Sequence, residues 1–95
     1  MNDTSLIKLG QYVKSIKGRD MNYIFIVSAI IDDKYVKVVD GDLRKVSNPK
    51  VKNIKHLQVI DKVSQVVNEA LKNGKKISDL MIKQEVIKLG LKDTK

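Results

Sequence analysis

The chain of 95 residues contains no cysteine and no tryptophan, and it has one phenylalanine and one proline. Without cysteine there is no disulfide framework, no thiolate zinc site and no cysteine nucleophile, so stability must come from packing. Because aromatic residues are few, the core must be aliphatic, and the many valines and isoleucines can supply it. The lack of cysteine also favours a reducing compartment, so we expect a cytoplasmic protein.

Long apolar runs are missing as well. The longest one covers residues 23–31 and stops at Asp32 and Asp33, far short of the roughly 20 residues that span a bilayer. In the first ten residues only Leu6 and Ile7 are adjacent aliphatics, too few for the apolar stretch of a secretory signal. We therefore expect neither export nor a membrane partner.

Enzyme and metal signatures are also absent. The five glycines form no phosphate-cradling loop, and neither an HExxH nor a GxSxG motif occurs. The only histidine, His56, is not accompanied by a pattern of further metal ligands. We therefore expect no catalysis, no metal and no cofactor.

What the chain does have is positive charge. Nineteen Lys and Arg residues outnumber eleven Asp and Glu residues, which leaves a net charge of +8 and a pI near 9.7. Such an excess makes nucleic acid the leading candidate partner. The alternative is a basic protein in which the charge only maintains solubility.

The apolar periodicity changes near Asp61, where a β-rich part gives way to a helical last third. We predict strands over residues 10–17, 23–31, 35–39, 42–46 and 56–60, with turns at 18–22 and at Asp40-Gly41. Pro49 cannot donate to a central ladder, so residues 47–55 are predicted to be an edge or a loop. Short strands joined by tight turns bury their apolar faces by curling together. The predicted fold is mainly β: an N-terminal arm (1–9), a small SH3-like barrel (10–60) and a helical appendage (61–95).

Two amphipathic helices are predicted in the appendage. The first carries an apolar stripe of Val66, Val67, Ala70 and Leu71 and ends near Gly74. The second begins at Ser78, repeats Ile82, Val86 and Leu89 at helical spacing, and is expected to end at Gly90. The barrel is the nearest surface for both helices. Because Leu80, Met81 and Ile87 widen the stripe, a protein partner or self-association through these helices is the alternative.

The segment from Gly10 to Asp20, GQYVKSIKGRD, is followed by an aliphatic strand and resembles the KOW motif of SH3-like barrels. The blocks at 32–36, 39–46 and 52–57 extend this likeness to the large-subunit ribosomal KOW proteins of the fourteen-e type, over about residues 8–60. A general KOW motif has glycine where this chain has Asn22, and asparagine tolerates the left-handed conformation required there. The resemblance implies RNA binding in association with the ribosome, with rRNA of the large subunit as the partner.

Two stretches carry the predicted RNA contacts. In the first, Lys14, Lys17 and Arg19 surround Gly18, whose missing Cβ lets backbone amides approach phosphate. The second, residues 43–56, carries five cations and no acid. The full predicted set is Lys14, Lys17, Gly18, Arg19, Asn22, Arg44, Lys45, Lys50, Lys52, Asn53, Lys55 and His56. The alternatives are that Gly18 and Asn22 only make a turn and that residues 43–56 form a solvated loop.

The three tyrosines could stack on unpaired bases. We expect Tyr23 to pack its ring against the barrel, and Tyr12 and Tyr35 remain open. With so few aromatic residues, we expect recognition of backbone and shape rather than of base sequence. The rival class is a protein-interaction module.

Overall fold

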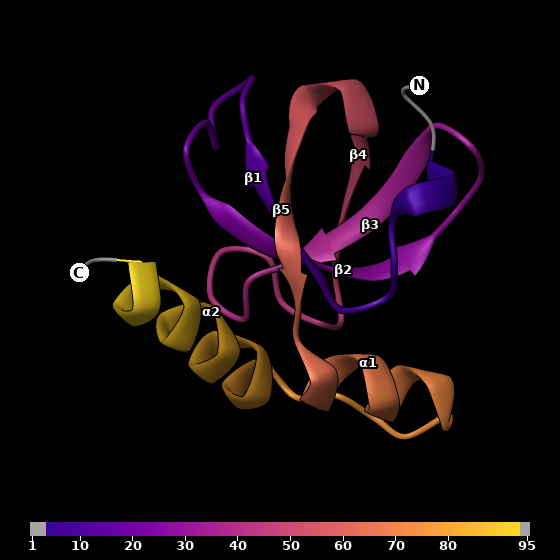
Figure 1. Cartoon of the computed structure of the whole chain (residues 1–95), viewed down its shortest axis with the longest axis vertical. Helices are drawn as coiled ribbons and strands as arrows, with labels where there is room; N and C mark the ends of the chain where they lie inside the picture. The colour runs from indigo at the N-terminus through magenta and orange to yellow at the C-terminus, as the bar shows by residue number, and fades with distance from the viewer. Residues whose placement is uncertain (1–3, 94–95) are drawn as a thin grey trace.

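A five-stranded antiparallel sheet followed by two helices makes up the computed structural model, which describes residues 4–93 (Figure 1). The strands are β1 (Gln11–Ser15), β2 (Ile24–Ile30), β3 (Tyr35–Val39), β4 (Lys50–Asn53) and β5 (Leu57–Val63). The helices are α1 (Gln65–Lys72) and α2 (Asp79–Asp93), and two short 3-10 helices, η1 (Thr4–Leu6) and η2 (Ile54–His56), precede β1 and β5. The predicted mainly β class with two C-terminal helices is confirmed.

The central strand β2 is apolar on both faces, as its sequence predicts. Phe25 and Val27 lie in an inner cluster with residues of the neighbouring strands, whereas Ile26 lies in a second cluster shared with the helices. All three side chains are fully buried. Alternation along one strand therefore places this segment between two apolar layers.

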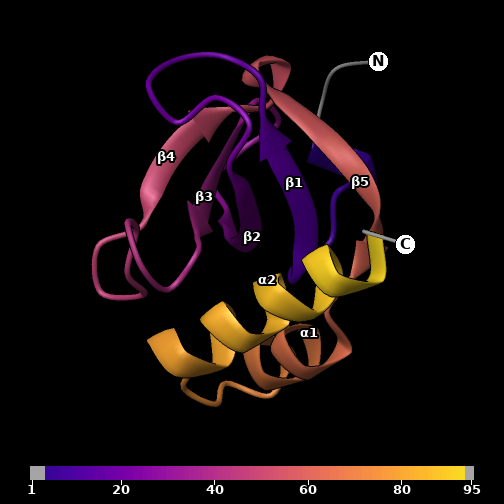
Figure 2. The ribbon, with the colours of Figure 1, turned by 90° about the vertical axis from the view of Figure 1, so that its left-hand side faces the viewer.

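The sheet order is β4-β3-β2-β1-β5, so β4 and β5 form its two edges. The strands curl toward each other, and η2 joins the two edges (Figures 1 and 2). Within residues 4–93 no ladder links β4 to β5, so the sheet is not closed and the predicted barrel is not confirmed. The four-residue strand β4 runs directly into η2, and the chain therefore turns before β4 can pair with β5.

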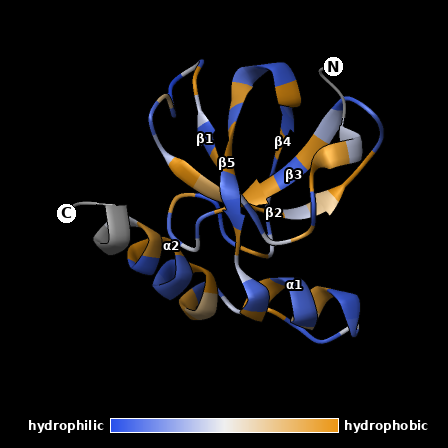
Figure 3. Cartoon of the chain, in the orientation of Figure 1, coloured by the Kyte–Doolittle hydropathy of each residue, from blue (hydrophilic) through white to orange (hydrophobic). Residues whose placement is uncertain are grey.

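Both helices lie on the same side of the sheet, below it in Figures 1 and 2. Val67 of α1 and Ile82 and Leu89 of α2 are buried against the outer face, and apolar and polar residues alternate along α2 (Figure 3). The sheet thus supplies the apolar surface that the helices require. Neither helix in the described part of the chain is long and apolar enough to cross a bilayer.

The predicted caps hold at two of three positions. At the end of α1, Gly74 has φ +69°, its amide donates to Leu71 O, and the amide of Lys75 donates to Ala70 O, which is the paired bonding of a Schellman cap. Ser78 Oγ accepts from Met81 N at 3.1 Å at the start of α2. The predicted end at Gly90 is wrong, because α2 continues to Asp93.

Residues 42–46 were predicted to form a strand, and this is wrong. The turn at Asp40-Gly41 is present, but Asp40 Oδ1 accepts hydrogen bonds from Asp42 N and Arg44 N, at 2.9 and 2.8 Å. A side chain that accepts hydrogen bonds from these amides offers the backbone an alternative to the hydrogen bonds of a β-sheet. Further along the loop, Val46 N donates to Asp79 Oδ1 of α2 at 2.7 Å. Residues 40–49 therefore form a loop, held by hydrogen bonds to the side chains of Asp40 and Asp79, instead of a strand.

Candidate nucleic-acid interface

The loop of residues 16–23, between β1 and β2, has two residues in the left-handed region. Gly18 has φ +95° and Asn22 has φ +76°, as the turn prediction requires. The amide of Asn22 donates to Ser15 O at 2.7 Å, and the amide of Met21 donates to Gly18 O at 3.2 Å. This loop lies at the end of the sheet opposite the helices, beside η2 (Figures 1 and 2).

Asp20 fixes the loop to the edge strand β4. Its Oδ1 accepts from Ser15 Oγ at 2.6 Å and from Lys52 Nζ at 3.1 Å, and its Oδ2 forms an ion pair with Lys50 Nζ at 3.2 Å. Lys52 Nζ also donates to Lys17 O at 3.2 Å. Burial alone would raise the pKa of Asp20, but the hydrogen bonds from Ser15, Lys52 and Lys50 outweigh it and lower that pKa to about 2. The carboxylate therefore stays charged and holds both lysines.

One hollow, which we name the Tyr23 hollow, opens between this loop and the loop of residues 40–49. Its volume is about 290 Å³. Its lining residues are Arg19, Asp20, Tyr23, Phe25, Leu43, Arg44 and Lys50. In Figure 2 the 16–23 loop, β4 and the 40–49 loop follow one another down one side of the sheet. Cations from three separate segments therefore meet around one exposed aromatic ring.

A second hollow, the Tyr35 hollow, is also lined by Lys50 and has a volume of about 570 Å³. Its lining residues are Lys17, Gly18, Tyr35, Lys50, Val51, Lys52, Asn53, Lys55 and His56, with no acidic residue among them. Partial burial and the positive charges of Lys17, Lys52 and Lys55 lower the pKa of His56. The field around His56 is positive because Lys17, Lys50, Lys52 and Lys55 line the same hollow and no acidic residue does.

The two hollows share Lys50 and form one continuous cationic surface. Together they are lined by six cations, Lys17, Arg19, Arg44, Lys50, Lys52 and Lys55, against the single carboxylate of Asp20. Lys52 differs from the other five, because its side chain is only 7% exposed and its ammonium is bound to Asp20 and to Lys17 O. It holds the loop in place and has little surface left for a ligand.

Nine of the twelve residues in the predicted set line the two hollows, and three do not. Lys14 lies on the same face of β1 as Tyr12, the face toward the helices, since side chains alternate along a strand. Lys45 is exposed in the 40–49 loop but lines neither hollow. Asn22 serves the turn through its left-handed backbone. Asn53 lines the Tyr35 hollow and also caps η2, where its Oδ1 accepts from Lys55 N at 3.0 Å.

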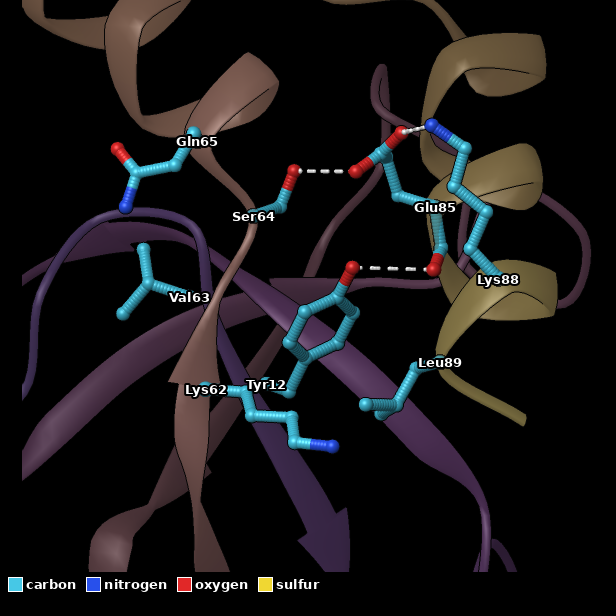
Figure 4. A pocket seen from close by; sticks show the side chains of 8 residues that line it. All are labelled: Tyr12, Lys62, Val63, Ser64, Gln65, Glu85, Lys88 and Leu89. Atoms are coloured by element: carbon cyan, nitrogen blue, oxygen red, sulfur yellow. Dashed lines mark hydrogen bonds and ion pairs between the residues drawn. The ribbon is translucent and has the colours of Figure 1, made fainter. Parts of the chain in front are cut away.

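A third hollow, of about 610 Å³, lies where α2 meets the sheet (Figure 4). Tyr12 OH donates to Glu85 O at 3.0 Å, Ser64 Oγ donates to Glu85 Oε1 at 2.8 Å, and Lys88 Nζ pairs with Glu85 Oε2 at 3.0 Å. Burial and the nearby charge of Glu85 raise the pKa of Tyr12. Since four of its lining residues, Tyr12, Ser64, Glu85 and Lys88, bind one another, this hollow is a helix-docking junction. Tyr12, for which the sequence left base stacking and packing open, is therefore a core residue.

Sequence reasoning missed Asp20 as the organising residue of the interface. The available signal was one acid inside a run of cations, next to Gly18-Arg19. Its partner Lys52 is 32 positions away, a pairing that local patterns do not reveal.

In comparisons with protein-family models and with curated proteins, nothing matches this chain.

Proposed function

We propose that this protein is a non-catalytic RNA-binding protein whose cationic surface holds the phosphate backbone of structured RNA. In this proposal the curled sheet is an SH3-like barrel of the KOW type with its edges left open. The RNA is rRNA of the large ribosomal subunit, as the resemblance of residues 8–60 to ribosomal KOW proteins implies.

The observation that carries the proposal is the convergence of cations from separate segments. Lys17 and Arg19 come from the 16–23 loop, Arg44 from the 40–49 loop, Lys50 from β4 and Lys55 from η2. Solvated protein surfaces usually mix charges of both signs. Among the described residues that line the two hollows, Asp20 is the only acid, and it is already paired with Lys50 and Lys52. A surface of this kind gains affinity by releasing the counterions of the phosphates that it neutralises.

A charge-reversal experiment tests the proposal. The variant Arg19→Glu/Lys55→Glu changes two exposed cations of the interface, one on each hollow. The control Lys75→Glu/Lys76→Glu makes the same change in net charge on exposed residues between α1 and α2. Lys52 is left intact, because reversing a buried, paired lysine would damage the fold.

Binding of rRNA fragments, measured by fluorescence anisotropy, should weaken about tenfold or more in the interface variant and much less in the control. Equal losses in both variants would mean that net charge alone draws the RNA. No binding by the unaltered chain would refute RNA binding. Sedimentation with large ribosomal subunits at low and high salt tests the ribosomal partner.

One observation favours a second candidate function, a protein-interaction module. Leu80 and Ile87 of α2 are 64% and 52% exposed, and at a spacing of seven they lie on one helix face. A partner protein or a second copy of the chain could cover them. Sedimentation equilibrium of the chain and of the variant Leu80→Ser/Ile87→Ser distinguishes these cases: self-association that the variant loses supports a dimer, and a monomer in both excludes it.

A further inference from the structure

The three tyrosines of the chain lie in two different environments. Tyr12 is 6% exposed, and its hydroxyl is bound to Glu85 O. Tyr23 and Tyr35 are 43% and 40% exposed, and within residues 4–93 no protein group hydrogen-bonds either hydroxyl. Tyr12 is thus a core residue, whereas the other two present aromatic surface to the solvent.

Both exposed tyrosines lie among the cations of the interface. Tyr23 lines its hollow with Arg19 and Arg44, and Tyr35 lines the other with Lys17 and Lys55. The ring of Tyr23 rests on the fully buried Phe25, with ring centroids 6.5 Å apart and planes tilted by 38°. The backbone of Tyr35 is held at the start of β3, where its amide donates to Asp32 Oδ1 at 2.9 Å. The Tyr23 ring is therefore supported by the core through Phe25, and Tyr35 belongs to strand β3 itself.

From this placement we infer that the interface takes RNA with unpaired bases, one stacking on Tyr23 and another on Tyr35, while the intervening backbone crosses Lys50. The inference rests on the proposed function and names the class of RNA. Aromatic side chains flanked by cations are the usual means of holding single strands, because every base has a π-face. Bases within a duplex have both faces covered by their neighbours and cannot stack in this way.

The dimensions of the Tyr23 hollow fit this assignment. At about 290 Å³ it lies just below the range of roughly 300–1,000 Å³ that drug-sized ligands require, which suits one flat heterocycle. Leu43 and Phe25 supply apolar walls, and Arg19, Arg44 and Lys50 supply charge. The packing of the Tyr23 ring on Phe25 agrees with the expectation from the sequence. Base stacking on its exposed side would add to the expected recognition of backbone and shape.

The experiment compares a hairpin RNA that has about eight unpaired loop nucleotides, within the range that single-strand-binding folds cover, with a blunt duplex of the same stem. Each is titrated against the full chain and against Tyr23→Ala, Tyr35→Ala, Tyr23→Phe and Tyr35→Phe. Thermal unfolding confirms that each variant is folded. Ring-proton NMR of the unaltered chain adds a direct readout, because Tyr12 serves as a buried internal control.

The inference predicts tighter binding of the hairpin than of the duplex. Each alanine variant should lose about 5- to 150-fold in hairpin affinity, and each phenylalanine variant should stay within about twofold. The ring protons of Tyr23 and Tyr35 should shift upfield, while those of Tyr12 should not. Equal binding of hairpin and duplex, with unaffected alanine variants, overturns the inference but leaves the proposed function standing. If neither RNA binds, the proposed function fails together with it.

Discussion

Lys52 Nζ lies 3.1 Å from Asp20 Oδ1, although the two residues are 32 positions apart in the chain. This contact joins the first loop of the sheet to its edge strand, and Lys50 reinforces it at Oδ2. The geometry of the cationic surface therefore depends on one buried carboxylate. The lysines that it binds are held in the positions from which the two hollows are built.

The first prediction concerns that carboxylate. Asp20→Asn removes the negative partner of two lysines and leaves Lys52 buried without its counter-charge. We expect the free energy of unfolding, measured in urea, to fall by about 2–3 kcal/mol. A matched control is Asp61→Asn, which changes an exposed carboxylate on β5 and should shift stability by less than about 0.5 kcal/mol. Equal effects would show that Asp20 has no special structural role.

The lowered pKa of Asp20 also predicts how stability depends on pH. The pKa is about 2 in the folded chain and has an ordinary value of 3.8, so the unfolded chain binds the proton more readily. The stabilisation is present above pH 4 and is lost as the pH falls from about 4 toward 2. Asp20→Asn should flatten this part of the curve, and an unchanged curve would contradict the assignment.

A second pH effect is expected in RNA binding. Partial burial and the charges of Lys17, Lys52 and Lys55 lower the pKa of His56 in the free chain. Bound phosphates offset these positive charges, so the pKa should rise on binding and affinity should increase as the pH falls below about 6.5. Anisotropy titrations measure the effect, and His56→Gln should abolish it. A pH dependence that persists in the variant would assign it to another group.

The docking of α2 depends on a glycine in the 40–49 loop. A Cβ at Gly41, where φ is +80°, would lie 2.4 Å from Asp79 O and 2.9 Å from Lys83 N. We expect Gly41→Ala to cost about 2–3 kcal/mol of stability, since backbone clash adds to left-handed strain. At Gly74 φ is +69°, but a Cβ there would have no atom within 4 Å, so Gly74→Ala should cost only about 1 kcal/mol of stability. Thermal unfolding of both variants gives the comparison, and equal losses would mean that close helix approach contributes nothing.

Tyr12 and the exposed tyrosines should respond differently to removal of the hydroxyl. Tyr12→Phe removes the hydrogen bond that the tyrosine hydroxyl donates to Glu85 O, and we expect a loss of about 1 kcal/mol in stability. Tyr23→Phe and Tyr35→Phe should be nearly neutral, because no protein group in the described part of the chain binds those hydroxyls. A destabilisation of similar size in all three would contradict the contrast between core and surface.

Local patterns predicted the parts of the fold that local physics decides. The doubly apolar segment around Phe25 is the central strand β2, the segment containing Pro49 leads into the edge strand β4, and Gly74 and Ser78 cap the helices. Prediction failed where a side chain competes with the ladder. Asp40 accepts hydrogen bonds from the amides of Asp42 and Arg44, and the strand expected there does not form.

The candidate site was predictable only as a set of charges. A run of cations and a glycine-containing loop marked most of its residues, but their arrangement depends on long-range contacts with Asp20. For the same reason the position of Lys14 was not predicted. It is close to the first loop in the sequence, but it lies on the side of β1 that faces the helices. Nor did the sequence reveal that Tyr23 lies in one hollow with Leu43 and Arg44 of a distant loop.

The dependence of RNA affinity on salt concentration tests the central claim most directly. Five cations remain available on the interface, Lys17, Arg19, Arg44, Lys50 and Lys55. At about −0.7 per phosphate contact on a single strand, log K against log salt should have a slope of about −3 to −3.5. Arg19→Gln/Lys55→Gln should reduce this magnitude by about 1.4, while Lys75→Gln/Lys76→Gln should leave it unchanged. A slope near zero, or equal reductions in both variants, would contradict a phosphate-binding surface built around Lys50.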